Sequence, residues 1–167
     1  QQGYIENIIP DGPFTADAFS LNVTADGELI VCGGGVDGSW GSLYNSSGFY
    51  KYKNDTWSNI NQYTHPALSG VLDLLSSATI NNKTYVGSFR KGLAVYDNAS
   101  GELTVFDRTN SPIEPNMGDL VRDAVSAVQS DKNRILWLGN AGATKPIKAL
   151  RPDGSWLEFS LPFNIAL

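Results

Sequence analysis

The residues of this chain that could bind a ligand are concentrated in the segment GGGVDGSWGSLYNSSG, residues 33–48. This segment joins three consecutive glycines to Asp37, Trp40 and Tyr44. Rings that stack and short polar groups that form hydrogen bonds together suit a sugar or a peptide. The alternative is structural: Trp40 fills the top of the fold and Asp37 forms a turn, because large aromatic residues are mostly buried.

A second group of candidate binding residues is basic. Arg90 and Lys91 are adjacent in SFRKGL, and Lys145 has an equivalent place in the next repeat of the chain. Charge-assisted hydrogen bonds from these side chains would bind an acidic group such as a phosphate or a uronic acid. The alternative is that they are solvated surface charges without a ligand.

No set of residues predicts catalysis. Asp73, Asp119 and Asp123 are candidates for paired carboxylates, but the sequence does not fix their separation. The single cysteine, Cys32, lies in an apolar run, where we expect a small buried side chain. The single histidine, His65, lies in a loop, where we expect a turn or hydrogen-bonding role. We therefore predict no enzyme activity, no cofactor and no metal.

These candidate residues are positioned by a repeated unit. Three segments, approximately 18–60, 71–107 and 121–161, each contain four short strands in the same order, and the second strand ends in glycine. Self-similarity at about 50 residues with four strands per repeat is typical of β-propeller blades. We predict an all-β fold, a partial β-propeller of three four-stranded antiparallel blades, in a single propeller fragment covering residues 1–167. A continuous sandwich of about twelve strands is the alternative, but it would not need to repeat its turns.

The strand order also predicts where the loops lie. In an antiparallel blade successive connections alternate between the two ends, so the short turns share one rim and the longer connections share the other. We expect function on the rim with the longer connections. Within segment 117–129 the apolar residues have near-helical spacing, but the segment's place in the repeat favours an inner strand.

Composition narrows the class of protein. The net charge is −5 and no cluster of Lys and Arg occurs, which argues against binding to nucleic acid. No stretch reaches the ~18 apolar residues that span a bilayer, and the first residues do not form a signal peptide. Low charge with many Gly, Asn, Ser and Thr residues fits an exported protein. The chain is then either a mature form or a piece of a longer protein.

Several phrases of the sequence resemble the PorZ family, two-propeller accessory proteins of the bacterial type IX secretion system that are related to two-component regulator propeller repeats. They lie at residues 33–50, 85–93, 110–112, 135–140 and 145–156. The first is fairly distinctive, whereas the others are generic to regulator-type propellers. The resemblance implies a non-catalytic scaffold in the periplasm or at the cell surface. Its partners would be envelope proteins of a secretion complex, including a sortase, and its role the attachment of cargo to anionic lipopolysaccharide.

The chain departs from this family in its extent, because three blades are fewer than the four to eight that close a propeller. Two blade faces are then uncovered. Neighbouring blades would cover them in a longer protein, which we favour, and otherwise the chain would form a homo-oligomer. The alternative function is a periplasmic sensor of a two-component regulator that binds an oligosaccharide. A third class is a propeller lyase or glycosidase using Asp37 or Asp73.

Overall fold

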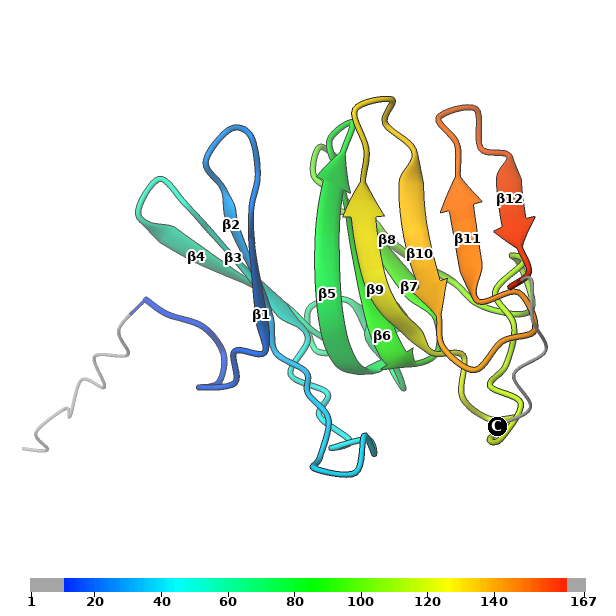
Figure 1. Cartoon of the computed structure of the whole chain (residues 1–167). Helices are drawn as coiled ribbons and strands as arrows, with labels where there is room; N and C mark the ends of the chain where they lie inside the picture. Colours follow the sequence, from blue (N-terminus) through cyan, green and yellow to red (C-terminus); the bar gives the residue numbers. More distant parts are fainter. Residues whose placement is uncertain (1–10, 162–167) are drawn as a thin grey trace, which may run out of the picture.

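The computed structural model describes residues 11–161 and confirms the all-β prediction. Three four-stranded antiparallel sheets follow one another along the chain, each with its strands in sequence order (Figure 1). Blade 1 contains β1 (Ser20–Val23), β2 (Leu29–Cys32), β3 (Phe49–Lys53) and β4 (Thr56–Ile60). Blade 2 contains β5 (Leu72–Ile80), β6 (Lys83–Arg90), β7 (Leu93–Asp97) and β8 (Leu103–Phe106). Blade 3 contains β9 (Val125–Ser130), β10 (Leu136–Asn140), β11 (Ile147–Leu150) and β12 (Trp156–Phe159).

The blades are stacked side by side and do not close into a barrel. The innermost strands are neighbours, β1 beside β5 and β5 beside β9 (Figure 1). The only helix in the described part of the chain is the 3₁₀ turn η1 (Pro66–Leu68), and no helix there is long and apolar enough to cross a membrane. The structure is therefore a partial β-propeller, as predicted.

Alternation along each strand builds two separate hydrophobic cores. Successive side chains of a strand point to opposite faces of the sheet. Ile30 and Phe49 of blade 1 pack on Leu74 of blade 2, whereas Val95 of blade 2 packs with Leu138 of blade 3. Blade 2 is covered on both faces, which explains why β5 and β6 are buried along most of their length.

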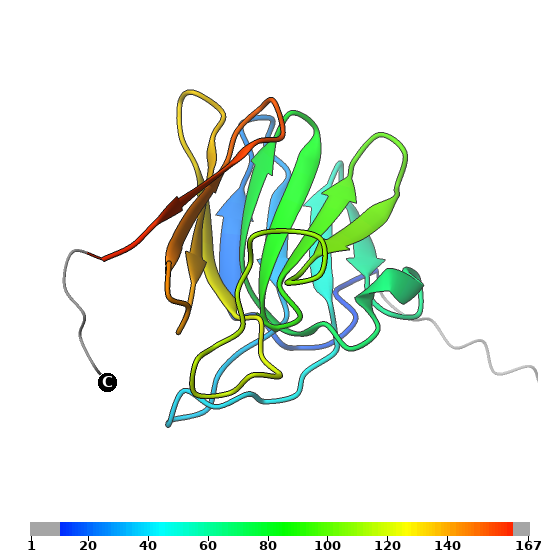
Figure 2. The same cartoon turned by 90° about the vertical axis from the view of Figure 1, so that its right-hand side faces the viewer.

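The short turns and the long connections lie at opposite ends, as the strand order predicts (Figures 1 and 2). Two of the hairpins turn on two residues that both have positive φ: Asn54 with Asp55, and Asn81 with Asn82. Asparagine and aspartate tolerate this conformation, which matches the right-handed twist of the flanking strands. The long β2–β3 and β8–β9 loops gather at the other end, which we call the loop rim.

One strand prediction is wrong over half its length. Within segment 117–129, β9 begins only at Val125, and the residues before it form consecutive turns. The side chain of Asn116 accepts a hydrogen bond from the amide of Gly118, and that of Asp119 accepts one from Val121. Such side-chain bonds to the local backbone compete with strand pairing. The segment is therefore a loop that leads into the inner strand.

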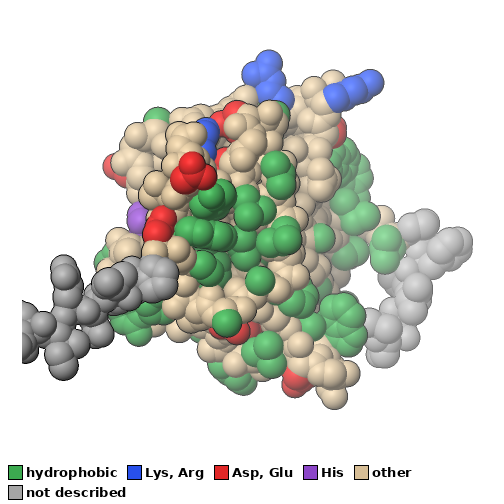
Figure 3. All heavy atoms as spheres, turned by 90° about the vertical axis from the view of Figure 1, so that its left-hand side faces the viewer, with side chains coloured by type: hydrophobic (Ala, Val, Ile, Leu, Met, Phe, Trp, Pro, Cys, Tyr) green, Lys and Arg blue, Asp and Glu red, His purple; other side chains and the backbone are tan. Residues whose placement is uncertain are grey.

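Within residues 11–161, no element covers the two outer blade faces, and both are apolar. Asn22 bonds to blade 2, so Leu21 and Val23 point outward, where they are 68% and 65% exposed. Figure 3 shows hydrophobic side chains gathered on this face of blade 1. On the outer face of blade 3, Phe159 is 39% exposed and packs against Trp137. In a complete propeller, further blades would cover such faces.

Candidate functional site

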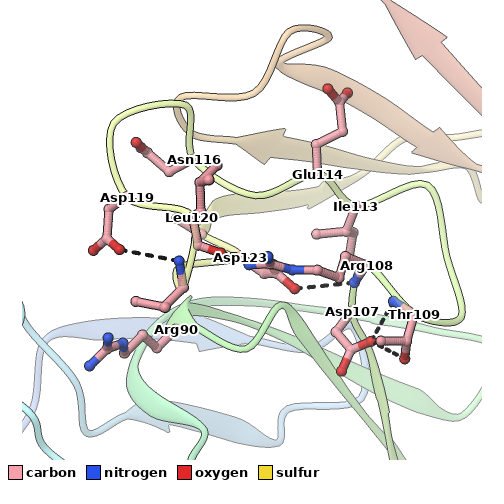
Figure 4. A network of polar contacts seen from close by, with 12 residues as sticks. Arg90, Asp107, Arg108, Thr109, Ile113, Glu114, Asn116, Asp119, Leu120 and Asp123 are labelled. Atoms are coloured by element: carbon pink, nitrogen blue, oxygen red, sulfur yellow. Dashed lines mark hydrogen bonds and ion pairs between the residues drawn. The ribbon is translucent and has the colours of Figure 1, made fainter.

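A cleft on the loop rim is lined by three basic side chains and by the carboxylates of Asp107 and Asp123. Figure 4 shows two of the basic residues, Arg90 and Arg108, with these carboxylates. The cleft has a volume of about 350 Å³ and lies between the β4–β5 loop, the β6–β7 turn and the β8–β9 loop. Arg90 and Lys91 line it from the turn, and Arg108 lines it from the β8–β9 loop. We call it the cationic cleft. The structure places both residues of the predicted basic pair in one rim pocket, and it adds Arg108.

Local backbone geometry fixes the predicted pair in this position. Lys91 and Gly92 both have positive φ, at 77° and 80°, which makes the tight β6–β7 turn. A Cβ atom on Gly92 would lie 2.1 Å from the carbonyl oxygen of Phe106, so only glycine fits. The Lys91 ammonium donates to the carbonyl of Ser69 at 2.7 Å. The turn is thereby joined to the β4–β5 loop.

Arg108 is held by a buried carboxylate. Asp123 is 4% exposed and accepts hydrogen bonds from the backbone amide of Arg108 at 3.1 Å and from its Nε at 2.7 Å. The hydrogen bond from Arg108 to Asp123 raises the pKa of Arg108. The charge of Arg108 is therefore largely neutralised within the protein, and its role is to fix the β8–β9 loop over the cleft.

Arg90, in contrast, forms no ion pair with any residue between 11 and 161. Its guanidinium lies 5.6 Å from the centre of the Tyr44 ring, so the structure unites two of the predicted binding residues across blades 1 and 2. Tyr44 is 66% exposed. A cation beside an exposed ring can contact both the charge and the apolar face of one ligand.

Hydrogen bonds to Asp73 fix the β2–β3 loop and thereby hold Tyr44 in place. This fully buried carboxylate on β5 accepts hydrogen bonds from the amides of Tyr44 at 3.1 Å and Asn45 at 3.0 Å, and from the hydroxyl of Ser42. Asp73 itself has a positive φ of 54°, and its amide donates to the carbonyl of Asn45 at 2.8 Å. Blade 2 thus shapes the loop of blade 1.

The other two residues of the loop have different roles. Asp37 accepts hydrogen bonds from the amides of Ser39 and Gly41 at 2.8 and 2.7 Å, so it forms the turn that the structural alternative predicts. The bond from Gly41 is the main cause of its lowered pKa. Trp40 is 76% exposed and has positive φ, so it does not fill the top of the fold within the three blades described.

Lys145 does not join the cationic cleft. Its ammonium pairs with Glu158 at 3.2 Å on blade 3. Glu158 also binds the fully buried Lys148 at 3.1 Å, and Lys148 binds Glu114 of the β8–β9 loop at 2.8 Å. This ion cluster fastens the β8–β9 loop to blade 3, and it leaves Lys145 with a partner inside the protein.

The candidate catalytic groups have structural partners. Asp73 and Asp123 are occupied as described above, and Asp119 accepts from the amide of Val121. Cys32 is fully buried, which raises the pKa of its thiol to about 11. His65 lies within hydrogen-bond distance of the Gly101 carbonyl, at 3.1 Å, as expected for a hydrogen-bonding role. In the region covered by the structure no three His, Cys, Asp or Glu side chains form a metal-binding group.

Larger hollows lie toward the short-turn end, where the blades diverge. One of about 480 Å³ separates blades 1 and 2, and one of about 610 Å³ separates blades 2 and 3. In the first, Lys51 is already paired with Glu28 at 3.0 Å and bonded to Asn98 at 2.7 Å. This cation is neutralised in the first hollow. We place the candidate site on the loop rim because the long connections, which most often carry function, gather there.

Sequence reasoning missed a signal in the repeats. The tetrapeptides beginning at Asp17, Asp73 and Asp123 share the pattern Asp-x-x-Ser, and each comes at the start of an inner strand. The carboxylate of Asp17 accepts from Asn45 at 2.9 Å, and the other two carboxylates hold rim loops as described. Alignment of the three repeats on this pattern would have identified these aspartates as loop anchors.

Comparison with known proteins supports the fold. No protein-family model and no curated protein sequence matches the chain. Its structure is similar to PorZ, an essential bacterial surface component of the type-IX secretion system of Porphyromonas gingivalis, with a TM-score of 0.71 and 22% identity over 94% of this chain and 21% of that one. The resemblance to PorZ that the sequence motifs indicated is therefore confirmed at the level of the fold.

Two extracellular domains from B. thetaiotaomicron are also similar. The domain of a protein assigned as a hybrid two component system gives a TM-score of 0.61 and 15% identity over 88% of this chain and 17% of that one. The domain of an assigned one component system gives 0.50 and 14% over 93% and 23%. The chain spans about a fifth of the length of these three solved proteins. The comparisons establish a shared fold.

Proposed function

We propose that this chain is a non-catalytic β-propeller module of the bacterial cell envelope, exported to the periplasm or the cell surface. Its cationic cleft binds an acidic glycan, such as the anionic lipopolysaccharide to which secreted cargo is attached. Its protein partners are envelope components of a secretion or attachment complex. The proposal is supported by structural likeness to a surface component of type-IX secretion and to two extracellular domains.

The main observation behind the proposal is that Arg90, which lines the cleft, lies 5.6 Å from the centre of the Tyr44 ring. Arg90 has no carboxylate partner among the described residues. Uronic acids and phosphorylated sugars present an anion next to an apolar ring face. The guanidinium matches the anion by charge-assisted hydrogen bonds, and the exposed tyrosine ring stacks on the sugar. Because the chain carries a net charge of −5, attraction of an anion depends on this local arrangement.

Binding of purified anionic lipopolysaccharide and of a polyuronic acid to the chain, measured by interferometry, tests the proposal. Arg90→Ala should weaken binding about tenfold, because one charge-assisted hydrogen-bonded contact is lost. Lys132→Ala is the control, since Lys132 is an exposed cation in the β9–β10 turn at the opposite end and lines none of the cavities described above. Binding should also weaken as salt is raised. Equal effects of the two substitutions would remove the cleft from the proposal.

A sensor domain that binds a neutral oligosaccharide is the second candidate. The similarity to extracellular domains of two component and one component systems favours it, and so does the exposed ring of Trp40 on the loop rim. A neutral ligand would bind with little dependence on salt, and Trp40→Ala would affect it more than Arg90→Ala. A neutral oligosaccharide series measured beside the acidic glycans therefore separates the two functions.

A further inference from the structure

A further cavity, of about 300 Å³, opens near the inner strands and is shared by all three blades. Phe19 lines it from the start of blade 1, Phe89 from the end of β6 and Arg122 from the residues before β9. It has no lining residue in common with the cationic cleft. We call it the inner cavity. A ligand bound there would be distinct from the acidic glycan proposed for the cationic cleft.

The wall of the inner cavity is mainly apolar and aromatic. Leu75 and Phe89 are buried in it, whereas Phe19 and Trp40 are 48% and 76% exposed. Exposed aromatic rings beside a cavity add apolar area that the hydrophobic cores do not use. Such a pocket binds the apolar part of a small ligand, and a few polar groups then fix its orientation.

Arg122 supplies the polar group. Its guanidinium lies 4.7 Å from the centre of the Phe89 ring, and its Nε is buried without a hydrogen-bond partner in the structure. It forms no ion pair within residues 11–161. A buried donor left unpaired is destabilising, so this nitrogen is unusual for a residue with a purely structural role.

The backbone that carries Arg122 is fixed. Its amide donates to the carbonyl of Asp119 at 3.0 Å, and its carbonyl accepts from the amide of Asn116 at 2.8 Å. The side chain of Asn116 in turn donates to the carbonyl of Ala141 at 3.3 Å. The guanidinium is therefore presented from a loop that is joined to blade 3, and little ordering is needed when a ligand binds.

We propose that the inner cavity binds a small hydrophobic carboxylate, an aryl or short acyl acid. The carboxylate bonds to the guanidinium of Arg122, whose planar fork matches two oxygens. The apolar body packs against Phe19, Trp40 and Phe89. A sugar fits less well, because the side chains of Asn116 and Ser126 already bond to backbone and would leave its hydroxyls unpaired.

The test uses 3-phenylpropanoate as the probe and the complete 167-residue chain. The Nε–H resonance of Arg122 is followed by NMR and assigned by its disappearance in Arg122→Met, which keeps an unbranched apolar stem over Phe89. We expect the resonance to shift on titration with the acid. Arg122→Met should bind about tenfold more weakly, as should the neutral 3-phenylpropanamide with the unmodified chain.

Three controls make the outcome decisive. Arg151→Met at the opposite end should bind the acid unchanged, and so should Arg90→Ala, which separates this proposal from the acidic-glycan function. Ala141→Leu keeps Arg122 and fills part of the cavity, so it should also abolish binding of the acid. If Arg122→Met does not fold, Ala141→Leu provides the test in its place. An unmoved Nε–H resonance at millimolar acid, or full binding by Ala141→Leu, would overturn the proposal.

Discussion

Replacement of Glu114 by glutamine should make the stability of the protein less dependent on acid pH. Burial alone would raise the pKa of Glu114, but hydrogen bonds from Lys148 and Thr144 outweigh it and lower that pKa from 4.5 to about 2. A carboxylate with a depressed pKa stabilises the folded state above its ordinary pKa, and this contribution is lost as the pH falls toward the folded-state value. The wild type should therefore lose stability between about pH 5 and 2.

The size of the effect follows from the two pKa values. A change from 4.5 to about 2, at about 1.36 kcal/mol per pH unit, gives at most about 3 kcal/mol. The Glu114 side chain is 25% exposed, so water screens part of this interaction. Lys148 keeps Glu158 as a partner at 3.1 Å in the variant. We expect Glu114→Gln to be about 1–3 kcal/mol less stable at pH 7, and the difference from wild type to vanish near pH 2.

Urea denaturation at a series of pH values measures this difference directly. Glu158 and other acidic groups titrate in both proteins, so subtracting the two curves isolates Glu114. Glu102→Gln is the control, because Glu102 is exposed and has no ion pair in the described part of the chain. In a Lys148→Met background, the further substitution Glu114→Gln should destabilise less than in the wild type, because only the hydrogen bonds from Thr144 and the Lys145 amide are then weakened. A stability difference that stays constant from pH 7 to 2 would refute this account.

Two further predictions concern the backbone and the blade faces. Gly48→Ala should destabilise by more than about 2 kcal/mol, because a Cβ there would lie 2.0 Å from the Ile60 carbonyl oxygen. Gly27→Ala, at a similar φ with nothing within 4 Å of the added Cβ, should destabilise by only about 1 kcal/mol. Urea denaturation of the two variants measures this difference, and equal losses of stability would argue against the clash at Gly48. The isolated chain should self-associate through its uncovered faces in light scattering, and Leu21→Lys should reduce this. A clean monomer that binds no apolar dye would contradict the last expectation.

Most of the fold follows from local chemistry that repeats along the chain. The Asn and Asp pairs at positions 54–55 and 81–82 demand tight hairpins, and the alternation of antiparallel strands places both hairpins at the same end of the blades. The burial of Cys32 follows equally from its place in an apolar strand. These features depend on nearest neighbours in sequence, so the sequence was sufficient to predict them.

The candidate site was less predictable because its contacts join distant loops. Tyr44 and Arg90 come from different blades, and Arg108 and Asp123 are brought together only by the fold of the β8–β9 loop. The position of Arg122 over Phe89 is of the same kind. No periodicity in a loop says whether a ring such as Trp40 is buried or exposed. Long-range pairing, rather than residue type, decides these properties.

Because Asp73 anchors the β2–β3 loop, the conformation of this blade 1 loop depends on blade 2, which comes later in the chain. Blade 1 supplies the loop with Tyr44, but the hydrogen bonds that shape this loop come from Asp73 on the first strand of blade 2. The next junction is similar, because the amide of Gly92 in blade 2 donates to the carbonyl of Asp123, which precedes blade 3. Each recognition loop thus becomes ordered only after the following unit has been synthesised and docked. During translation, the β2–β3 loop would become ordered only after the following repeat has been made, and a truncation before blade 2 would leave Tyr44 without the carboxylate of Asp73 that shapes its loop.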